Sequence, residues 1–351
     1  NRNKDISKTR KVRSVTAEID LGKAQFNPKA ELVVTKPNMI DYFEVAGSAT
    51  GDTTNPTTLT QDIPGQAGSL LLNHRVDMNE SIYFKGRINL GNKYEGYSLG
   101  GRAGGDGISV VFTTSDPGTI GLSGASIGLG GIPNSFGFKL DTWHNTSNPA
   151  VNQKASSDPK FPGYQNGAFG AFYSTDGAGK AITLLQDTVK LQSNPVNNEF
   201  KDFTIMYNGK TKEMIVTYDG QTFSRNVFDF IQKTRLTTKQ KPGSEELSFA
   251  IFASTGSGTN LQQVDLEEFR YTAGGSYIKL LYIDDINGKV VQKEKIIQGK
   301  VGDNIDLSDK IQVLGYDKVR SNVETAQGYV RDNTVKFLQG IQTITYTYSN
   351  S

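Results

Sequence analysis

The feature that most constrains the fold of this chain is an alternation of apolar and polar residues that is broken by Asn-Gly and Asp-Gly pairs. Residues 203–207 alternate in this way before Asn208-Gly209, and residues 214–218 do so before Asp219-Gly220. A period of two residues is typical of a strand with one buried face. Asn-Gly and Asp-Gly tolerate the positive φ angles of two-residue hairpin turns. The pattern therefore predicts two consecutive antiparallel hairpins.

Short strands and turns of this kind continue over residues 30–272, where helical periodicity is scarce. Residues 109–112 and 248–252 are mostly apolar runs, which indicates strands buried on both faces. The 38 glycines suit many tight turns. We therefore expect an all-β chain with a two-sheet sandwich over residues 30–272. Residues 51–64 and 145–165 lack either pattern and are expected to be long loops.

Small residues at positions 272–276 mark a joint between domains. Beyond it, strand patterns at residues 277–283, 290–297 and 341–348 predict a second, small β domain over residues 273–351. Residues 1–29 are expected to be a basic, solvated tail or linker. This expectation depends on one basic run, made of Arg2, Lys4, Lys8, Arg10, Lys11 and Arg13 with Asp5 as its single acid.

Charge and composition exclude several classes of function. Lys and Arg number 38 against 36 Asp and Glu, so no overall field favours nucleic acid or anionic lipid. The absence of cysteine excludes disulfides, thiolate metal sites and thiol nucleophiles. No apolar run approaches the length of a membrane span, and no signal-peptide pattern opens the sequence. We expect no membrane insertion, and an exported protein of this sequence would be a processed or excised part.

Oxygen-bearing residues gather where the strand pattern at residues 137–141 runs into the loop that follows. Asp141, the Trp143 carbonyl and Asn145 stand at positions i, i+2 and i+4, which point to one side of extended backbone. Asp158 can return from the long loop to join them. Calcium takes six to eight oxygen ligands, and this set supplies about five if Asp141 binds through both oxygens. The pattern predicts a calcium site, although such residues in loops are also common turn formers.

Four segments in this order resemble the L-type lectin family, which includes legume seed lectins and the lectin modules of serine-rich-repeat adhesins on Gram-positive bacteria. The segments are residues 104–112, 124–130, 137–145 and 249–256. The resemblance covers residues 30–272 and implies a jelly-roll sandwich that binds sugar with the help of calcium. It further implies an extracellular module on a bacterial cell surface, with a role in adhesion and virulence and a glycan or glycoprotein partner. A monomer is favoured.

The resemblance also implies roles for single residues. Asp106 would follow a cis peptide bond and accept hydrogen bonds from two sugar hydroxyls. Asn145 would ligate calcium through its oxygen and donate to the same sugar through its NH₂ group, a division that suits an amide. Ala125 would donate its backbone N–H to the sugar.

A loop at residues 255–261 would form the outer wall of the sugar pocket, with Gly256, Ser257, Gly258 and Asn260 as candidate contacts. An aromatic side chain usually stacks on the apolar face of a bound sugar. Trp143, Phe161 and Tyr164 are candidates for this stacking contact, and Trp143 is the only tryptophan.

One position departs from the legume pattern. Plant members have Glu two residues before the metal-binding Asp, where it holds a transition metal, whereas this sequence has Lys139. A protonated amine cannot ligate a metal. The later His ligand has no counterpart, since only His74 and His144 exist. We therefore predict calcium alone, with the Lys139 ammonium filling part of the electrostatic gap.

The second domain resembles the β-grasp repeats of mucin-binding proteins at residues 277–288 and 299–303. Because its polar residues form no convergent cluster, a spacer is predicted rather than a second binding site.

Two other functions are alternatives to sugar binding. A jelly-roll glycoside hydrolase needs a pair of acids, commonly at alternating strand positions, but Lys139 and Trp143 flank Asp141. His74 and His144 lie in no nucleophile motif. The sequence therefore predicts no enzyme. A structural stalk that has lost its ligand remains the alternative to a sugar-binding module.

Overall fold

The computed structural model describes residues 11–13, 18–20, 22–52, 54–146 and 153–350. The chain divides into two compact units, Leu32–Thr272 and the remainder, Asn1–Glu31 with Ala273–Ser351. Arg2, Lys4, Lys8 and Arg10 of the predicted basic tail lie outside the described residues. Within the described ranges, no helix has both the length and the apolar character needed to cross a bilayer.

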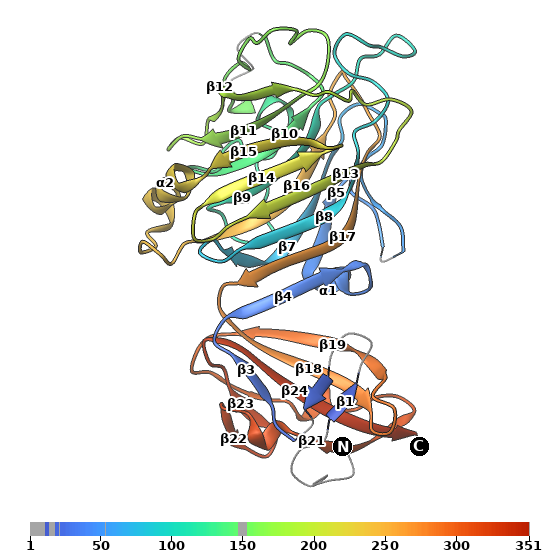
Figure 1. Ribbon diagram of the computed structural model, residues 1–351, viewed down its shortest axis with the longest axis vertical. Coiled ribbons are helices and arrows are strands. Elements are labelled where there is room, and N and C mark those ends of the chain that lie inside the picture. Colours follow the sequence, from blue (N-terminus) through green and yellow to red (C-terminus); the bar gives the residue numbers. More distant parts are fainter. Residues whose placement is uncertain (1–10, 14–17, 21, 53, 147–152, 351) are drawn as a thin grey trace. The chain divides into compact units, whose positions relative to one another are not determined.

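The larger unit consists almost entirely of strands with few and short helices (Figure 1). Its strands are β4 (Ala30–Thr35), β5 (Phe43–Gly47), β6 (Thr57–Thr60), β7 (Ala67–Asp77), β8 (Ile82–Asn89), β9 (Gly107–Thr113), β10 (Phe136–Asp141), β11 (Phe169–Thr175), β12 (Ala181–Lys190), β13 (Lys201–Tyr207), β14 (Glu213–Tyr218), β15 (Gln221–Asn226), β16 (Glu246–Ser254) and β17 (Gln262–Ala273). Its helices are α1 (Met39–Tyr42), α2 (Phe228–Thr238) and the 3-10 turns η1 (Lys36–Asn38) and η2 (Gly124–Ser126).

The strands of this unit form one continuous sheet that folds over on itself. Its order is β12-β11-β10-β9-β16-β7-β17-β8-β13-β14-β15. Strands β10 and β15 are far apart in this order, yet the rings of Phe138 and Phe223 lie 5.0 Å apart between their centroids. The sheet therefore closes into two packed layers, with β13–β15 in front of β9 in Figure 1. This confirms the predicted all-β sandwich.

Phenylalanines fill the space between the layers. Phe249 stacks on Phe269 at 4.8 Å and packs edge-on against Phe112 at 5.3 Å, and all three are at most 2% exposed. Burying a side chain of this size stabilises a fold by about 1.5–3 kcal/mol. The two central strands β9 and β16 have no exposed residue, as their mostly apolar runs predicted.

The two predicted hairpins are present, with one difference. Asp219 and Gly220 both have positive φ, 47° and 79°, and join β14 to β15 as a two-residue turn. The loop before β14 is longer than the predicted Asn208-Gly209 turn. The Asn208 side chain accepts hydrogen bonds from the backbone N–H groups of Lys210 and Thr211, and these bonds stabilise a five-residue loop instead.

The helix α2 was not predicted. It buries Phe230, Ile231 and Thr234 against the sandwich, and Phe230 stacks on Phe136 at 5.3 Å. Because only these few side chains carry the contact, the helical period is too weak to read in a chain dominated by strand patterns.

The second unit contains a mixed sheet in which β18 pairs parallel with β24 and antiparallel with β19, and β24 also pairs with β21 and β3. A separate small sheet has the order β20-β23-β22. The bounds are β1 (Lys11–Arg13), β2 (Glu18–Asp20), β3 (Gln25–Asn27), β18 (Ser276–Asp284), β19 (Val290–Gly299), β20 (Asn304–Asp306), η4 (Ser308–Lys310), β21 (Tyr316–Ser321), η5 (Val323–Thr325), β22 (Tyr329–Arg331), β23 (Thr334–Lys336) and β24 (Gly340–Asn350).

The end of the segment predicted as a basic tail, residues 1–29, is part of this unit. Strand β3 pairs antiparallel with β24, and Ala24 is buried in the core beside Ile278 and Tyr346. The Ala24 amide donates to Thr325 Oγ1 at 2.6 Å. The prediction of a solvated tail is wrong for residues 24–27, because it followed a charge run that ends at Arg13, whereas the strand's partner lies some three hundred residues further along the chain.

Candidate functional site

The strands β9 and β10 bring the two halves of the predicted site together. They pair antiparallel with Asp141 opposite Gly107, so the end of β10 meets the start of β9. The Thr142 amide donates to the Asp106 carbonyl at 3.0 Å. The Gly105–Asp106 peptide bond is cis, as the resemblance implied. The predicted sugar-binding acid therefore lies directly beside the predicted metal loop.

Asp106 is held on one side by β16. Its amide donates to the Ser254 carbonyl at 2.8 Å, and the Ser254 hydroxyl donates to Asp106 Oδ2 at 2.7 Å. The buried Gln262 side chain fixes both neighbours, accepting from the Gly107 amide and donating to the Ser254 carbonyl. Burial raises the pKa of Asp106, and the Ser254 hydrogen bond opposes this rise. The second carboxylate oxygen, Oδ1, has no hydrogen bond to any described residue and is available as an acceptor.

The two acids of the predicted metal site meet on a lysine. Lys139 Nζ lies 3.0 Å from Asp141 Oδ2 and 2.9 Å from Asp158 Oδ1. Lys139 is 1% exposed, and both acids are buried. Burial alone would lower the pKa of Lys139, but the charges of Asp158 and Asp141 raise it above its ordinary value. Burial raises the pKa of Asp141 to about 8, and the Lys139 charge works against that rise.

The other two predicted metal positions belong to the same arrangement. The Trp143 amide donates to Asp141 Oδ1 and the Asn145 amide donates to Asp158 Oδ2, both at 2.9 Å. The Asp158 amide in turn donates to the Asn145 carbonyl at 2.8 Å. The structure thus brings Asp141, Trp143, Asn145 and Asp158 into one hydrogen-bonded cluster. The side-chain amide of Asn145 bonds no described residue.

This donor set suits a hard cation. Within the described parts of the chain, no three His, Asp or Glu side chains converge to hold a metal. Calcium also binds amide and backbone carbonyl oxygens, so two carboxylates with Asn145 and the Trp143 carbonyl are a compatible set. One ammonium faces two carboxyl groups, so the three groups carry one excess negative charge once both acids are ionised. A second metal ion on the Lys139 side of these carboxyl groups does not fit, because the Lys139 ammonium already lies within 3.0 Å of both.

A hollow of about 400 Å³ opens next to this cluster. Trp143 lines it together with residues from two loops, and the complete lining is Gly100, Gly101, Arg102, Ala103, Trp143, Ser257 and Gly258. Gly256 precedes the lining residue Ser257 and lies close to Asp106, because a Cβ placed on it would lie 3.8 Å from Asp106 Oδ1. Arg102, the one charged side chain of the lining, donates to the Ser257 carbonyl at 3.3 Å.

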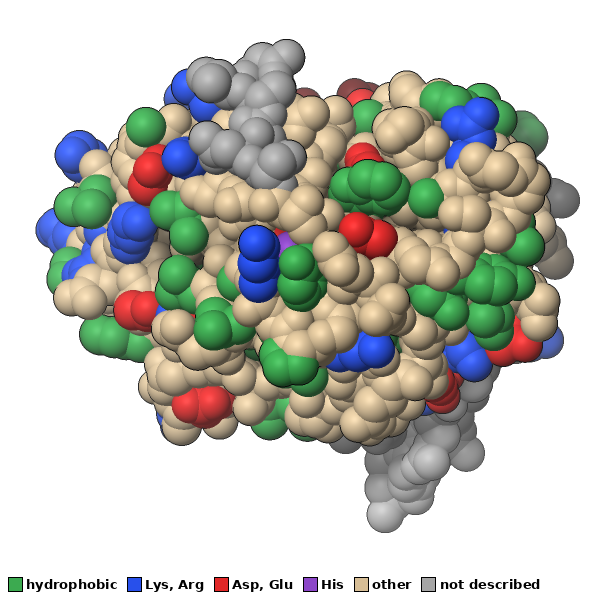
Figure 2. All heavy atoms as spheres, turned by 90° about the horizontal axis from the view of Figure 1, so that it is seen from above, with side chains coloured by type: hydrophobic (Ala, Val, Ile, Leu, Met, Phe, Trp, Pro, Cys, Tyr) green, Lys and Arg blue, Asp and Glu red, His purple; other side chains and the backbone are tan. Residues whose placement is uncertain are grey.

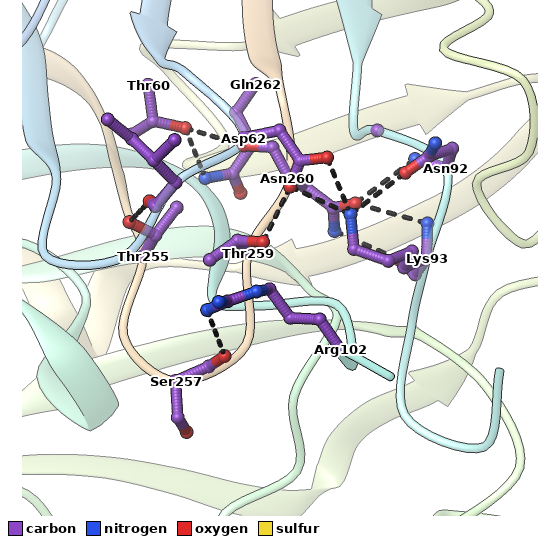
Figure 3. Close-up of polar contacts among 12 residues, drawn as sticks. Thr60, Asp62, Asn92, Lys93, Arg102, Thr255, Ser257, Thr259, Asn260 and Gln262 are labelled. Atoms are coloured by element: carbon purple, nitrogen blue, oxygen red, sulfur yellow. Dashed lines mark hydrogen bonds and ion pairs between the residues drawn. The ribbon is translucent and has the colours of Figure 1, made fainter. Parts of the chain in front are cut away.

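Figure 3 shows the polar contacts that hold the loops around the hollow together. Lys93 is 2% exposed and bonds both oxygens of Asp62, at 2.8 and 2.9 Å. Thr259 Oγ1 donates to the same carboxylate at 2.6 Å. Burial alone would raise the pKa of Asp62, but the hydrogen bonds from Lys93 and Thr259 lower it below its ordinary value. The network joins the loop after β8 to the loop before β17.

Asn260, predicted as a sugar contact, belongs to this support. It is fully buried, its Oδ1 accepts from the amides of Asn92 and Lys93, and its Nδ2 donates to the Lys93 carbonyl. Gly91 passes so close that a Cβ on it would come within 2.2 Å of Asn260 Oδ1. The Asn260 side chain therefore faces the protein interior and does not line the hollow.

The other predicted contacts, Ala125, Phe161 and Tyr164, do not line the hollow. The Ala125 amide donates to the Gln153 side chain at a long 3.3 Å. Phe161 and Tyr164 pack on His144, with ring centroids 5.8 and 4.5 Å away. Of the three candidate stacking aromatics, only Trp143 lines the hollow.

The site also contains four residues for which the sequence predicted no role: Arg102, Glu95, Ser254 and Gln262. The Glu95 amide donates to the Thr142 carbonyl at 2.9 Å, and Glu95 Oε2 accepts from the His144 amide at 2.6 Å. The one usable signal was the Gly100-Gly101 pair before Arg102, which indicates an exposed, close-turning loop. Figure 2 views this loop end of the larger unit, and the residues that it colours intersperse basic and acidic side chains rather than forming a broad patch of one sign.

Comparisons with known proteins find one family and a group of close relatives. The family described as the legume lectin beta-barrel domain matches residues 34–268. The serine-rich adhesin for platelets of Staphylococcus aureus is 40% identical over 329 residues, which are 91% of this chain and 14% of that protein. Its counterpart in strain MRSA252 is also 40% identical, over 91% of this chain and 23% of its own length. The chain therefore spans less than a quarter of these relatives.

Among solved structures, the lectin from Bauhinia forficata in complex with GalNAc covers 69% of this chain and 98% of its own, with 14% identity and a TM-score of 0.45. The family match and the adhesin relatives identify a binding module and not an enzyme. This chain belongs to the legume, or L-type, lectin domain family.

Proposed function

We propose that this chain is a calcium-dependent, glycan-binding module of a bacterial surface adhesin, displayed outside the cell and bound to glycans or glycoproteins of other cells. The family match and the 40% identity to a serine-rich adhesin support this proposal. One observation carries it furthest: Asp106 Oδ1 is without a partner among described residues, beside a hollow lined by Trp143 and the loop containing Ser257.

The chemistry of these groups suits a sugar. Asp106 accepts hydrogen bonds from two vicinal hydroxyls, and the Asn145 NH₂ group donates to one of them. Trp143 offers an aromatic face to the C–H side of the ring. Gly256, Ser257 and Gly258 form the outer wall, with Ala125 contributing its N–H once it releases Gln153. Asn260 acts indirectly, by holding the backbone behind that wall.

The calcium site would be made by Asp141, the Trp143 carbonyl, Asn145 and Asp158. Calcium at this site would supply positive charge beside the two buried carboxyl groups, and Asn145 would offer it an amide oxygen. The chain's own residues then transmit this order to the sugar site, because Thr142 bonds the Asp106 carbonyl and Glu95 bonds both Thr142 and His144. Sugar binding with so few polar contacts is weak per site, so adhesion would depend on many copies.

The second unit is proposed to be a β-grasp-like spacer. Support comes from its parallel pairing of β18 with β24 in the middle of a mixed sheet. In the alternative function, a stalk without ligand, the whole chain would be a spacer.

A glycan array probed with residues 1–351 separates the two functions. We expect binding to a subset of glycans that disappears in chelator, returns with added calcium and is absent in the Asp106→Asn variant. Normal binding by Asp106→Asn would show that the proposed pocket is wrong. No binding in either condition, by a chain with a native circular dichroism spectrum, would favour the stalk.

A further inference from the structure

The Lys139 ammonium is a charged group buried in the larger unit. Lysine is rarely buried without ionic partners, because removing its charge from water is costly. Here Lys139 is 1% exposed and lies in strand β10. Its partners are the carboxylates of Asp141 and Asp158, at 3.0 and 2.9 Å.

The surroundings of Lys139 are built for a cation. Its Nζ lies 5.3 Å from the ring centroid of Phe169 and 5.5 Å from that of Tyr173, within the range of cation–π attraction. Lys139 lies inside β10, paired with Ser109 on β9 and Ala171 on β11, so its backbone is fixed on both sides. The sheet therefore fixes the backbone of Lys139, whereas Asp158, which the ammonium contacts, lies outside the sheet.

The carboxylates carry this order into the loop. Asp141 uses one oxygen for Lys139 and the other for the Trp143 amide. Asp158 likewise uses one oxygen for Lys139 and the other for the Asn145 amide. Without a cation between them, two carboxylates at this separation would repel each other in a buried site. The Lys139 charge removes that repulsion before any metal arrives.

We propose that Lys139 is a built-in cation that holds Asp141 and Asp158, and through them the amides of Trp143 and Asn145, in place in the absence of calcium. It is a positioning residue: it holds Asp141 and Asp158 so that calcium enters a preformed site, and a second metal is not needed. This inference rests on the proposed calcium site for its functional meaning, but the order that it predicts in the calcium-free chain stands independently.

Hydrogen exchange at two amides tests the proposal. The Trp143 and Asn145 amides report directly on Asp141 and Asp158, and the Gly107 amide, which donates to Gln262, is an internal control. In chelator, both reporter amides of the wild-type chain are expected to be protected. In Lys139→Met they are expected to exchange at least about tenfold faster in chelator and to regain protection with calcium, with Gly107 unchanged.

Two results would overturn the proposal: unprotected reporter amides in the calcium-free wild type, or equal protection in calcium-free Lys139→Met. Failure of the calcium site gives a different result, because calorimetry would then detect no calcium binding by the wild type while the chelator experiment retained its meaning.

The Lys139→Glu variant covers the case in which Lys139→Met does not fold. It places a third carboxylate beside Asp141 and Asp158, a set that suits a divalent ion. We expect its thermal midpoint to be lowered in chelator and restored by manganese, whereas manganese leaves the wild type unchanged. Stable folding of Lys139→Glu in chelator, with protected reporter amides, would contradict the need for a cation here.

Discussion

The amide of Thr142 donates to the carbonyl oxygen of Asp106 at 3.0 Å, and the peptide bond that precedes Asp106 is cis. This hydrogen bond, next to the pairing of Asp141 with Gly107, joins the segment that holds the proposed calcium ligands to the proposed sugar-binding acid. Loss of order in the calcium loop should therefore reach the sugar site, while loss of the Asp106 carboxylate should leave the calcium loop intact.

Asp106→Asn and Asp141→Asn should separate the two functions. Asp106→Asn removes a charged acceptor for sugar hydroxyls, so glycan affinity should fall about a hundredfold while calcium affinity is unchanged. Asp141→Asn should weaken both. Calcium calorimetry and glycan binding, measured on the same preparations, check this. Equal calcium loss in both variants would refute the division of roles.

Trp143→Ala should weaken glycan binding by about tenfold through the loss of a stacking face. Tyr164→Ala should have a smaller effect, because that ring packs on His144 and does not line the hollow. Titration of an immobilised glycan with each variant gives the comparison. A larger loss in Tyr164→Ala would place the stacking contact elsewhere.

Arg102→Ala should weaken glycan binding by about tenfold while changing stability by less than about 0.5 kcal/mol, because Arg102 is exposed and its one protein hydrogen bond is long. Arg270→Ala is the matched control, since it removes an exposed arginine paired with Glu268 on β17. Comparing acidic with neutral glycans would show whether the Arg102 charge meets the ligand. Equal effects of the two substitutions would exclude a role for Arg102 in the pocket.

Asn260→Ala should destabilise the larger unit by about 2–4 kcal/mol, because it leaves the buried amides of Asn92 and Lys93 and the Lys93 carbonyl without partners. Glycan affinity should fall as the wall loop loosens. Urea unfolding measures the first effect. Unchanged stability with a large loss of binding would instead return Asn260 to the role of a direct contact.

His74 should make stability depend on pH. Burial lowers the pKa of His74 from 6.5 to about 4. At pH 5 this histidine is therefore mostly protonated in the unfolded chain and mostly neutral in the folded chain. Stability from this residue is complete above pH 6.5 and is lost as the pH falls toward 4, by about 2 kcal/mol at pH 5. Urea unfolding of the wild type and of His74→Gln at pH 7.5 and pH 5 tests this. An equal pH dependence in both chains would refute it.

Much of this protein is determined locally and can be read from the sequence. Alternation with a period of two and turn residues such as Asp219-Gly220 specify strands and hairpins, because strand geometry and positive φ are properties of neighbouring residues. The order of the lectin-like segments led to the family, the cis bond before Asp106 and the set of Asp141, Asn145 and Asp158. The identity of Lys139 excluded a second metal ligand without any structure.

Only the tertiary structure decided where the partners of these residues lie. The sequence gives a lysine at position 139. Only the fold brings Asp158 back to β10, and this places the Lys139 ammonium between Asp141 and Asp158. Arg102 reaches Ser257, Asn260 turns inward to Lys93, and β3 joins β24, all across more than 150 residues. Contacts over such separations leave no period or motif in the sequence, because they are set by how the sheets fold together and not by the residues next to them.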